Sequence, residues 1–331
     1  MPSRPYSARE WEHLTRYHEH EWPDDWTAKR DDRDAWESTI DAICARHGLA
    51  ARRGPIAPEA GSNLAVMLDD AVVKVFARRN PVWYPREVEA LRALAATPEA
   101  KAPRLVAEGE VTHAGRVHPY LVMARIEGTP LRTVWKDLSR EELHGVAREL
   151  AAVVHAVHST PVDALSSFGT PPDEWVRRMR ARAGLARDHF KADVSPALLE
   201  QVESFLESRL PSIRPDFTPT FLSADVIGGN VLVGRERGRW HVTGLVDYGD
   251  VEVGPVAYEW VSVCQKALRS DPELIAAFFD AYGVTSPLHD GSHELLHLYT
   301  LLHRFSLLPF AAADHPEIER LQALLDVLLP T

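Results

Sequence analysis

The segment FLSADVIGGNVLVGRERGRWHVTGLVDYGD, residues 221–250, decides the expected fold and chemistry of this chain. Two apolar runs in it flank the polar turn at 234–239, a pattern that predicts a β-hairpin. Asp225 and Asn230 precede the hairpin and Asp247 follows it. Because the two ends of a hairpin lie at one edge, we expect these three oxygen-bearing side chains to converge.

The spacing of these side chains is typical of phosphoryl transfer. One carboxylate orients or deprotonates the attacking hydroxyl, while an amide oxygen and a second carboxylate hold Mg²⁺ against the nucleotide phosphates. Asp225 and Asn230 have the kinase catalytic-loop spacing, and Asp247-Tyr248-Gly249 stands where kinases have Asp-Phe-Gly. We therefore expect Asp225 to be the catalytic base and Asn230 and Asp247 to be magnesium ligands. Taken singly, each motif is more typical of an ordinary turn.

A lysine inside an apolar strand adds a second part of a nucleotide site. Lys74 lies within the run AVVKVF, residues 71–76, where burial is costly for an ammonium group that has no anionic partner. Kinases place a lysine at this point to contact the nucleotide phosphates and to pair with a helix glutamate. In the expected helix 85–96, Glu87 is the partner that we choose, and Glu89 is the alternative, a surface charge. The competing explanation is a lysine on an edge strand.

A glycine-containing turn precedes this strand pair. It reads EAGSN over residues 59–63 and leads into the strand-like residues 64–68. The backbone N–H groups of such a turn can bind phosphates, so we assign Ser62 to the nucleotide site, although most such turns only connect strands. The chain contains neither a Walker A sequence nor GxGxxG, which argues against P-loop and Rossmann folds.

Together, these segments resemble the aminoglycoside phosphotransferase family, and the order of the expected elements is most similar to the hygromycin B phosphotransferases. The resemblance implies an α+β fold with the two lobes of a protein kinase. A small N-lobe sheet would occupy residues 52–123, and a larger, mostly helical C-lobe would occupy residues 124–331. An N-terminal helical extension at 1–51 would precede them. Only the catalytic segments carry specific motifs.

The resemblance also implies a hinge between the lobes. An apolar run that begins at Pro119 leads into a turn with Gly128, where a kinase chain passes from one lobe to the other. Adenine would then pair with the backbone carbonyl of Ala124 and the backbone amide of Ile126, behind Met123. Backbone pairing of this kind suits a purine, so ATP is the expected nucleotide and GTP stays open.

One motif departs from the family pattern. Family members generally read His-Gly-Asp where this chain reads Ser223-Ala224-Asp225. The missing groups mainly support the loop, whereas the expected base and metal ligands are present. Further along, GPVAYEW at 254–260 resembles the family pattern Gly-Asp-Pro-x-Tyr-Asp. This resemblance implies that Glu259 braces the catalytic loop.

The composition narrows the class of protein. With 45% hydrophobic and 26% charged residues, the 331-residue chain is typical of a soluble globular protein. Its net charge of −11 argues against nucleic acid or an anionic membrane as a partner. Cys44 and Cys264 lack metal-binding spacing, and the charged N-terminus shows no secretory signal. We therefore expect a cytoplasmic protein that acts on a small hydroxylated molecule, while its oligomeric state stays open.

Helical patterns account for most of the remaining chain. A Ser139 cap with Glu142 indicates a capping box at the start of the longest helix. The arginines of the segment 175–190 are expected to form a solvated helix face. The expected helices lie at 7–20, 34–47, 85–96, 139–158, 175–190, 195–210, 271–282, 292–310 and 316–329.

These observations lead to an ATP-dependent O-phosphotransferase, and the resemblance implies an antibiotic acceptor, with resistance as the outcome. The expected acceptor side contains carboxylates, which suit a cationic aminoglycoside such as hygromycin. It also contains histidine and arginine, so a nucleoside antibiotic stays open as the acceptor. A small-metabolite kinase for a sugar or amino alcohol is one alternative, and a nucleotide-binding pseudokinase with a regulatory role is another. The acceptor-side residues are Asp280, Asp290, Glu294, His297, Tyr299, His303 and Arg304.

Overall fold

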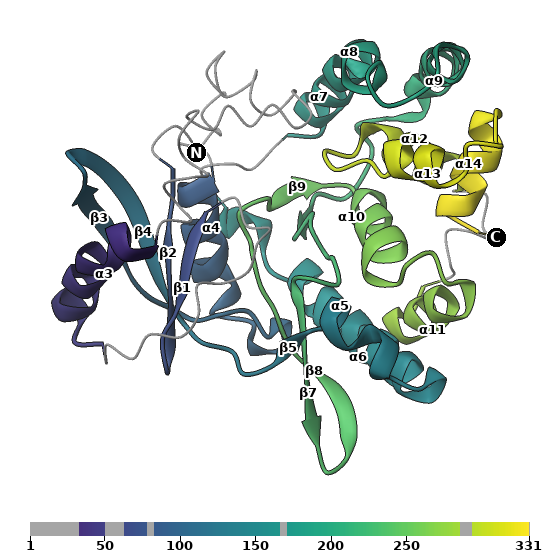
Figure 1. Ribbon diagram of the computed structural model, residues 1–331. Coiled ribbons are helices and arrows are strands. Elements are labelled where there is room, and N and C mark those ends of the chain that lie inside the picture. The colour runs from purple at the N-terminus through teal and green to yellow at the C-terminus, as the bar shows by residue number, and fades with distance from the viewer. Residues whose placement is uncertain (1–32, 50–62, 78–82, 166–170, 285–292, 331) are drawn as a thin grey trace.

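The computed structural model describes residues 33–49, 63–77, 83–165, 171–284 and 293–330. The chain forms a small antiparallel sheet flanked by helices and a larger, mostly helical part (Figure 1). This arrangement confirms the expected α+β fold with two lobes. The expected helix at 7–20 and the turn that contains Ser62 lie outside the described residues.

The N-lobe sheet has four antiparallel strands in the order β1-β2-β4-β3. Alternation of apolar side chains over short runs produces these strands, and the β2–β4 register pairs Lys74 with Leu121. Because β2 lies between β1 and β4, the edge-strand explanation of Lys74 is wrong. The strands are β1 (Leu64–Met67), β2 (Ala71–Val75), β3 (Leu105–His113) and β4 (Arg116–Ala124).

A helix packs on each face of this sheet (Figure 1). Helix α3 (Arg33–His47) buries Trp36 in a core with the β2 residues Val73 and Val75. Helix α4 (Trp83–Leu94) packs on the other face, where it carries Glu87 towards the sheet. The period-2 alternation of strand side chains thus supplies both faces with apolar contacts.

The hairpin expected from the sequence is present and carries the linker between the lobes. Strand β7 (Val231–Glu236) pairs with β8 (Arg239–Leu245), and the short β5 (Thr129–Pro130) extends the sheet beside β7. At Gly244 an added Cβ would lie 2.7 Å from Cδ1 of Ile126. The missing side chain at this position therefore lets the linker lie directly on the hairpin.

The centre of the C-lobe is α6 (Arg140–His158), which begins at the expected capping box of Ser139 and Glu142. Its apolar face packs against α11 (Pro272–Tyr282) and against β8. Next to it lie the elements that frame the site. These are β6 (Thr220–Leu222), β9 (Glu252–Gly254), α10 (Val256–Ser262) and the single-turn π-helix η5 (Val263–Ala267).

A second helical core fills the far side of the C-lobe (Figure 1). The expected helix at 292–310 is broken into two helices, because the second begins anew with a proline in its first turn. Among the described helices, none is long and apolar enough to span a membrane. The helices of this core are α7 (Pro172–Gly184), α8 (Ala186–Phe190), α9 (Pro196–Arg209), α12 (His293–Leu302), α13 (Leu308–Asp314) and α14 (Leu321–Leu328).

The expected solvated arginine face of the segment 175–190 is wrong in part. Arg178 and Arg182 on α7 are only 1% and 2% exposed. Arg178 pairs with Glu252 of β9, and Arg182 donates a hydrogen bond to the hydroxyl of Tyr258. These acceptors lie far along the chain, so the pattern of α7 alone gave no sign of them.

Candidate active site

The ends of the hairpin meet as the sequence predicts. The N–H of Val246 donates to the carbonyl of Asn230 at 3.0 Å, and Val231 pairs with Leu245 in the strand register. The residue that precedes β7 therefore lies beside the residues that follow β8. This arrangement places Asn230 next to the segment that carries Asp247.

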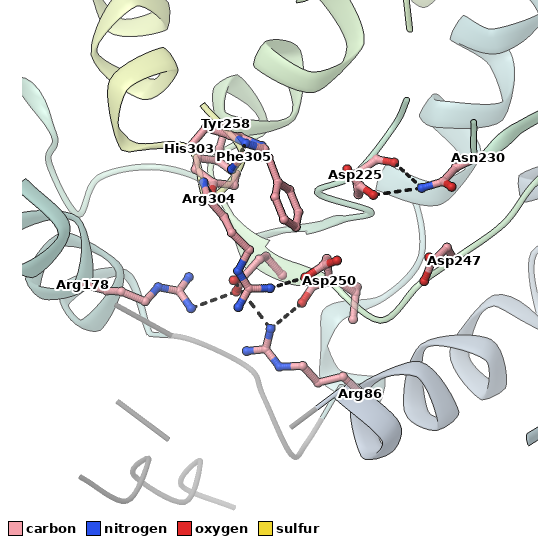
Figure 2. A network of polar contacts seen from close by, with 12 residues as sticks. Arg86, Arg178, Asp225, Asn230, Asp247, Asp250, Tyr258, His303, Arg304 and Phe305 are labelled. Carbon is pink, nitrogen blue, oxygen red and sulfur yellow. Dashed lines mark hydrogen bonds and ion pairs between the residues drawn. The ribbon is translucent and has the colours of Figure 1, made fainter. Parts of the chain in front are cut away.

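Asp225 and Asn230 form one hydrogen-bonded unit (Figure 2). Nδ2 of Asn230 donates to the Asp225 carboxylate at 2.9 Å and to the Asp225 carbonyl at 3.0 Å. These bonds use the amide nitrogen of Asn230 and orient the Asp225 side chain. The amide oxygen of Asn230 can only accept, so it is the atom with which this residue would bind a cation.

Lys74 joins the N-lobe to the end of the hairpin. Its ammonium donates to the Glu87 carboxylate at 2.7 Å and to the Asp247 carboxylate at 2.9 Å. Burial by itself disfavours the charge, but the carboxylates of Asp247 and Glu87 outweigh it and raise the pKa of Lys74 above its ordinary value. Strand β2, helix α4 and the hairpin thus bring together three of the residues that the sequence singled out.

Asp247 combines a charge with access to solvent. Its side chain is 46% exposed, whereas Glu87 is 1% exposed. Partial desolvation by the surrounding protein opposes ionisation of Asp247, yet Lys74 and the backbone N–H of Gly249 lower its pKa below the ordinary value. A charged, accessible carboxylate beside an amide oxygen is the hard-oxygen donor set that suits Mg²⁺. The residues Asn230 and Asp247 therefore fit a magnesium ion.

The Asp225 carboxylate lies in a more enclosed environment. Burial raises its pKa to about 7, with Lys266 opposing this rise and the negative charges of Asp250 and Asp247 adding to it. A pKa near 7 matches the requirement for a general base. Lys266 belongs to η5 and was missed from the sequence, although a lysine inside the apolar run VSVCQKAL is the same signal that pointed to Lys74.

Glu259 holds the loop that carries Asp225. The backbone N–H of Ala224 donates to both Glu259 carboxylate oxygens, at 3.0 and 3.2 Å. Glu259 is fully buried, and Ser262 and His158 provide further contacts to it. Ala224 has a φ of +59°. The bracing role that the family resemblance implies for Glu259 thus matches a direct contact with the loop that carries Asp225.

An arginine network lies beside these aspartates (Figure 2). Glu252 is 2.9 Å from the Arg178 guanidinium and 3.6 Å from that of Arg86. Asp250 pairs with Arg304, and its negative charge also acts on Asp225. The sequence pattern did not reveal this network, because each pair joins segments that are distant in the chain.

The expected hinge residues lie one strand away from Lys74. Met123 is 7% exposed and pairs with Val72 in the β2–β4 register. The amide of Ala124 donates to the carbonyl of Arg104 at 2.8 Å, and Ile126 follows on the linker. The end of β4 therefore lies three residues beyond Leu121, the register partner of Lys74, and the hinge stays a prediction.

The sequence matches the phosphotransferase enzyme family, APH, over residues 55–296, which is more than half of the chain. Among solved structures, a GDP complex of wild-type aminoglycoside 2'-phosphotransferase-IIIa has a TM-score of 0.64 and 16% identity, over 87% of this chain and 96% of that chain. Spectinomycin phosphotransferase APH(9)-Ia in complex with ADP and spectinomycin has a TM-score of 0.56 and 15% identity, over 88% of this chain and 92% of that chain. A thermostable mutant of aminoglycoside phosphotransferase APH(4)-Ia, in a ternary complex with ADP and hygromycin B, has a TM-score of 0.58 and 16% identity, over 89% of this chain and 100% of that chain.

Proposed function

Because the chain belongs to the phosphotransferase enzyme family, we propose that it transfers the γ-phosphoryl group of ATP to a hydroxyl of a small-molecule antibiotic. The observation that supports this proposal most is the convergence of Lys74, Glu87 and Asp247 beside the Asp225–Asn230 pair. Aminoglycosides come first as acceptors, since similar structures were solved with such antibiotics. Resistance to the antibiotic is the proposed outcome.

In this proposal Asp225 is the catalytic base. It orients the acceptor hydroxyl and takes up its proton as the new O–P bond forms and the bond to the leaving ADP breaks. Asn230 keeps the carboxylate in place through its hydrogen bond of 2.9 Å. Because burial raises the pKa of Asp225 to about 7, the carboxylate can accept a proton near neutral pH.

The nucleotide side of the site has two parts. Lys74, fixed by Glu87, neutralises phosphate charge, and Asn230 and Asp247 would hold Mg²⁺ through oxygen atoms. When bound, Mg²⁺ supplies positive charge to the β- and γ-phosphates. The backbone of Ala124 and Ile126 would pair with the purine. Since similar structures contain ATP, ADP or GDP, ATP is proposed first and GTP second.

The arginine network favours a second class of acceptor. Four arginines lie close enough to Glu252 to lower its pKa, and Asp250 is the other acid of this network. This buried cluster consequently carries more positive than negative side chains, and its excess positive charge beside the site does not suit a polycation. A nucleoside antibiotic is the second candidate acceptor. The arginines are Arg86, Arg178, Arg182 and Arg304.

A substrate panel tests the proposal. Purified protein with Mg-ATP is incubated with aminoglycosides, nucleoside antibiotics, sugars and amino alcohols, and ADP release and product mass are followed. We expect one compound to gain one phosphoryl group. Phosphorylation of only a sugar or amino alcohol would replace the antibiotic with a metabolite, and nucleotide binding without turnover would indicate a regulatory pseudokinase.

Two variants test the residue assignments in the same assay. Asp225→Asn is expected to lower kcat by about 10²–10⁴-fold, as loss of a general base does, and to keep its affinity for Mg-ATP. Asp247→Ala is expected to weaken Mg-ATP binding itself. Full turnover by Asp225→Asn would show that the base is wrongly assigned, and normal Mg-ATP binding by Asp247→Ala would do the same for the metal ligand.

A further inference from the structure

Three potential metal ligands meet in the C-lobe, and one of them is His297, which was expected on the acceptor side of the site but lies against α14 in the structure. His293 and His297 lie one turn apart on α12, and Asp326 lies on α14. Each offers one ligand atom, and these atoms all lie within 4.8 Å of one another. Helices α12 and α14 lie in the helical core near the C-terminus (Figure 1). The cluster therefore joins two helices of that core.

One nitrogen in this cluster lacks a hydrogen-bond partner among the described residues. His297 is 1% exposed, and its Nε2 makes no hydrogen bond in this part of the chain. The nearest carboxylate oxygen, on Asp326, is 3.8 Å away, which is too far for a hydrogen bond. A buried polar atom without a partner is costly. Coordination of a metal ion would satisfy it.

His293 is already oriented as metal-binding histidines usually are. Its Nε2 lies 3.1 Å from the carbonyl oxygen of Leu329. Because a carbonyl only accepts, Nε2 must carry the proton, and Nδ1 keeps its free lone pair. Histidine ligands generally donate their other N–H to a carbonyl or carboxylate in this way.

We propose that His293, His297 and Asp326 bind a divalent transition-metal ion of the zinc class, which links α12 to α14. Two imidazoles and a carboxylate, with water as the fourth ligand, are a common zinc donor set. Bonds of about 2.1 Å in a tetrahedron place ligand atoms about 3.4 Å apart. The 3.8 Å between His297 and Asp326 is close to that value. Nitrogen donors distinguish this site from an all-oxygen magnesium site.

Gln322 fits the metal-bound state as a neighbour of the ligands. Its amide lies 3.2 Å from Nδ1 of His297 and 2.8 Å from the Asp326 carboxylate. With the ion on Nε2, the neutral imidazole carries its proton on Nδ1. A 180° rotation of the Gln322 amide then presents its oxygen to that N–H. The rotation gives up the hydrogen bond to Asp326, and the metal ion takes the place of that donor on the carboxylate.

Metal binding by the full chain tests this proposal without any use of catalytic activity. The protein is freed of metal with a chelator, and Zn²⁺ is titrated in by calorimetry and in thermal melts without nucleotide. We expect one equivalent of Zn²⁺ to bind and to raise Tm. Co²⁺ should give the visible absorption of a tetrahedral site.

Variants distinguish this site from nonspecific binding of Zn²⁺ by surface histidines. His293→Gln and Asp326→Asn alter the less buried ligands, and each is expected to lower the Zn²⁺ affinity at least tenfold. His315→Gln is the matched control, because His315 also lies near a carboxylate, that of Glu317 at 3.5 Å, and it should bind like the wild type. Absence of stoichiometric Zn²⁺ binding, or equal affinity in all variants, would overturn the proposal.

Discussion

Replacement of Glu252 by glutamine measures how strongly the buried arginine network stabilises the fold. Burial alone would raise the pKa of Glu252, but Arg178 and Arg86 outweigh it and lower the pKa from 4.5 to about 2. At 1.36 kcal/mol per pKa unit, this difference corresponds to about 3 kcal/mol. Loss of one partner of a buried ion pair costs about 3–5 kcal/mol. We therefore expect Glu252→Gln to lower the free energy of unfolding by about 3 kcal/mol at pH 7.

The contribution of Glu252 to stability depends on pH. Because the folded pKa of Glu252 is below its ordinary value of 4.5, its contribution is complete above pH 4.5 and is lost as the pH falls through about 2. The difference in stability between wild type and Glu252→Gln should therefore be constant from about pH 8 to about pH 5. Below pH 4.5 the difference should narrow, because the unfolded wild type takes up a proton first.

Urea denaturation followed by tryptophan fluorescence provides the measurement, at a series of pH values. Glu273→Gln is the matched control, because Glu273 also pairs with an arginine, Arg140, but its side chain is 69% exposed. An exposed pair of this kind contributes less than about 1 kcal/mol. Equal losses of unfolding free energy in Glu252→Gln and Glu273→Gln would refute the reasoning. So would a stability difference between wild type and Glu252→Gln that does not narrow below pH 4.5.

Three further predictions concern the site and its support. Lys266→Met should lower kcat about tenfold, equal to about 1.4 kcal/mol of lost electrostatic stabilisation near Asp225, while Lys266→Arg keeps the charge and most of the rate in steady-state assays. Glu259→Gln leaves the Ala224 N–H with one acceptor oxygen in place of two. We expect kcat to fall about tenfold and the affinity for ATP, measured by calorimetry, to stay unchanged. Gly254→Ala places a Cβ 2.5 Å from the Trp175 ring and should lower the free energy of unfolding by about 1–3 kcal/mol in urea denaturation. An unchanged kcat in Lys266→Met or Glu259→Gln, or an unchanged unfolding free energy in Gly254→Ala, would contradict the corresponding prediction.

The parts of the fold that the sequence predicted are those encoded locally. The hairpin needs only two apolar runs and a polar turn, and α6 needs only an apolar stripe and a capping box. Lys74 was recognisable because an ammonium group in an apolar strand requires nearby anions, and the structure supplies Glu87 and Asp247. Each of these signals lies within a short stretch of chain, so one sequence suffices to detect it.

The parts that were missed depend on tertiary contacts. Arg178 and Arg182 look like surface arginines on a polar helix, and only the folded chain brings Glu252 and Tyr258 to them. A polar helix face does not reveal whether it is solvated or satisfied by distant partners. Likewise, the cluster of His293 and Asp326 spans two helices, and no spacing rule within one segment identifies it.

Ala224 introduces backbone strain into the loop that carries Asp225. Its φ of +59° lies in the left-handed region, which costs a residue with a Cβ about 1–2 kcal/mol and a glycine almost nothing. A glycine at this position would adopt the same bend without this cost. In this chain Glu259 helps to hold the strained conformation, because its carboxylate accepts a hydrogen bond from the Ala224 N–H. Glu259 therefore offsets part of this backbone strain, and a change that weakens its contact with Ala224 is expected to let the loop relax next to Asp225.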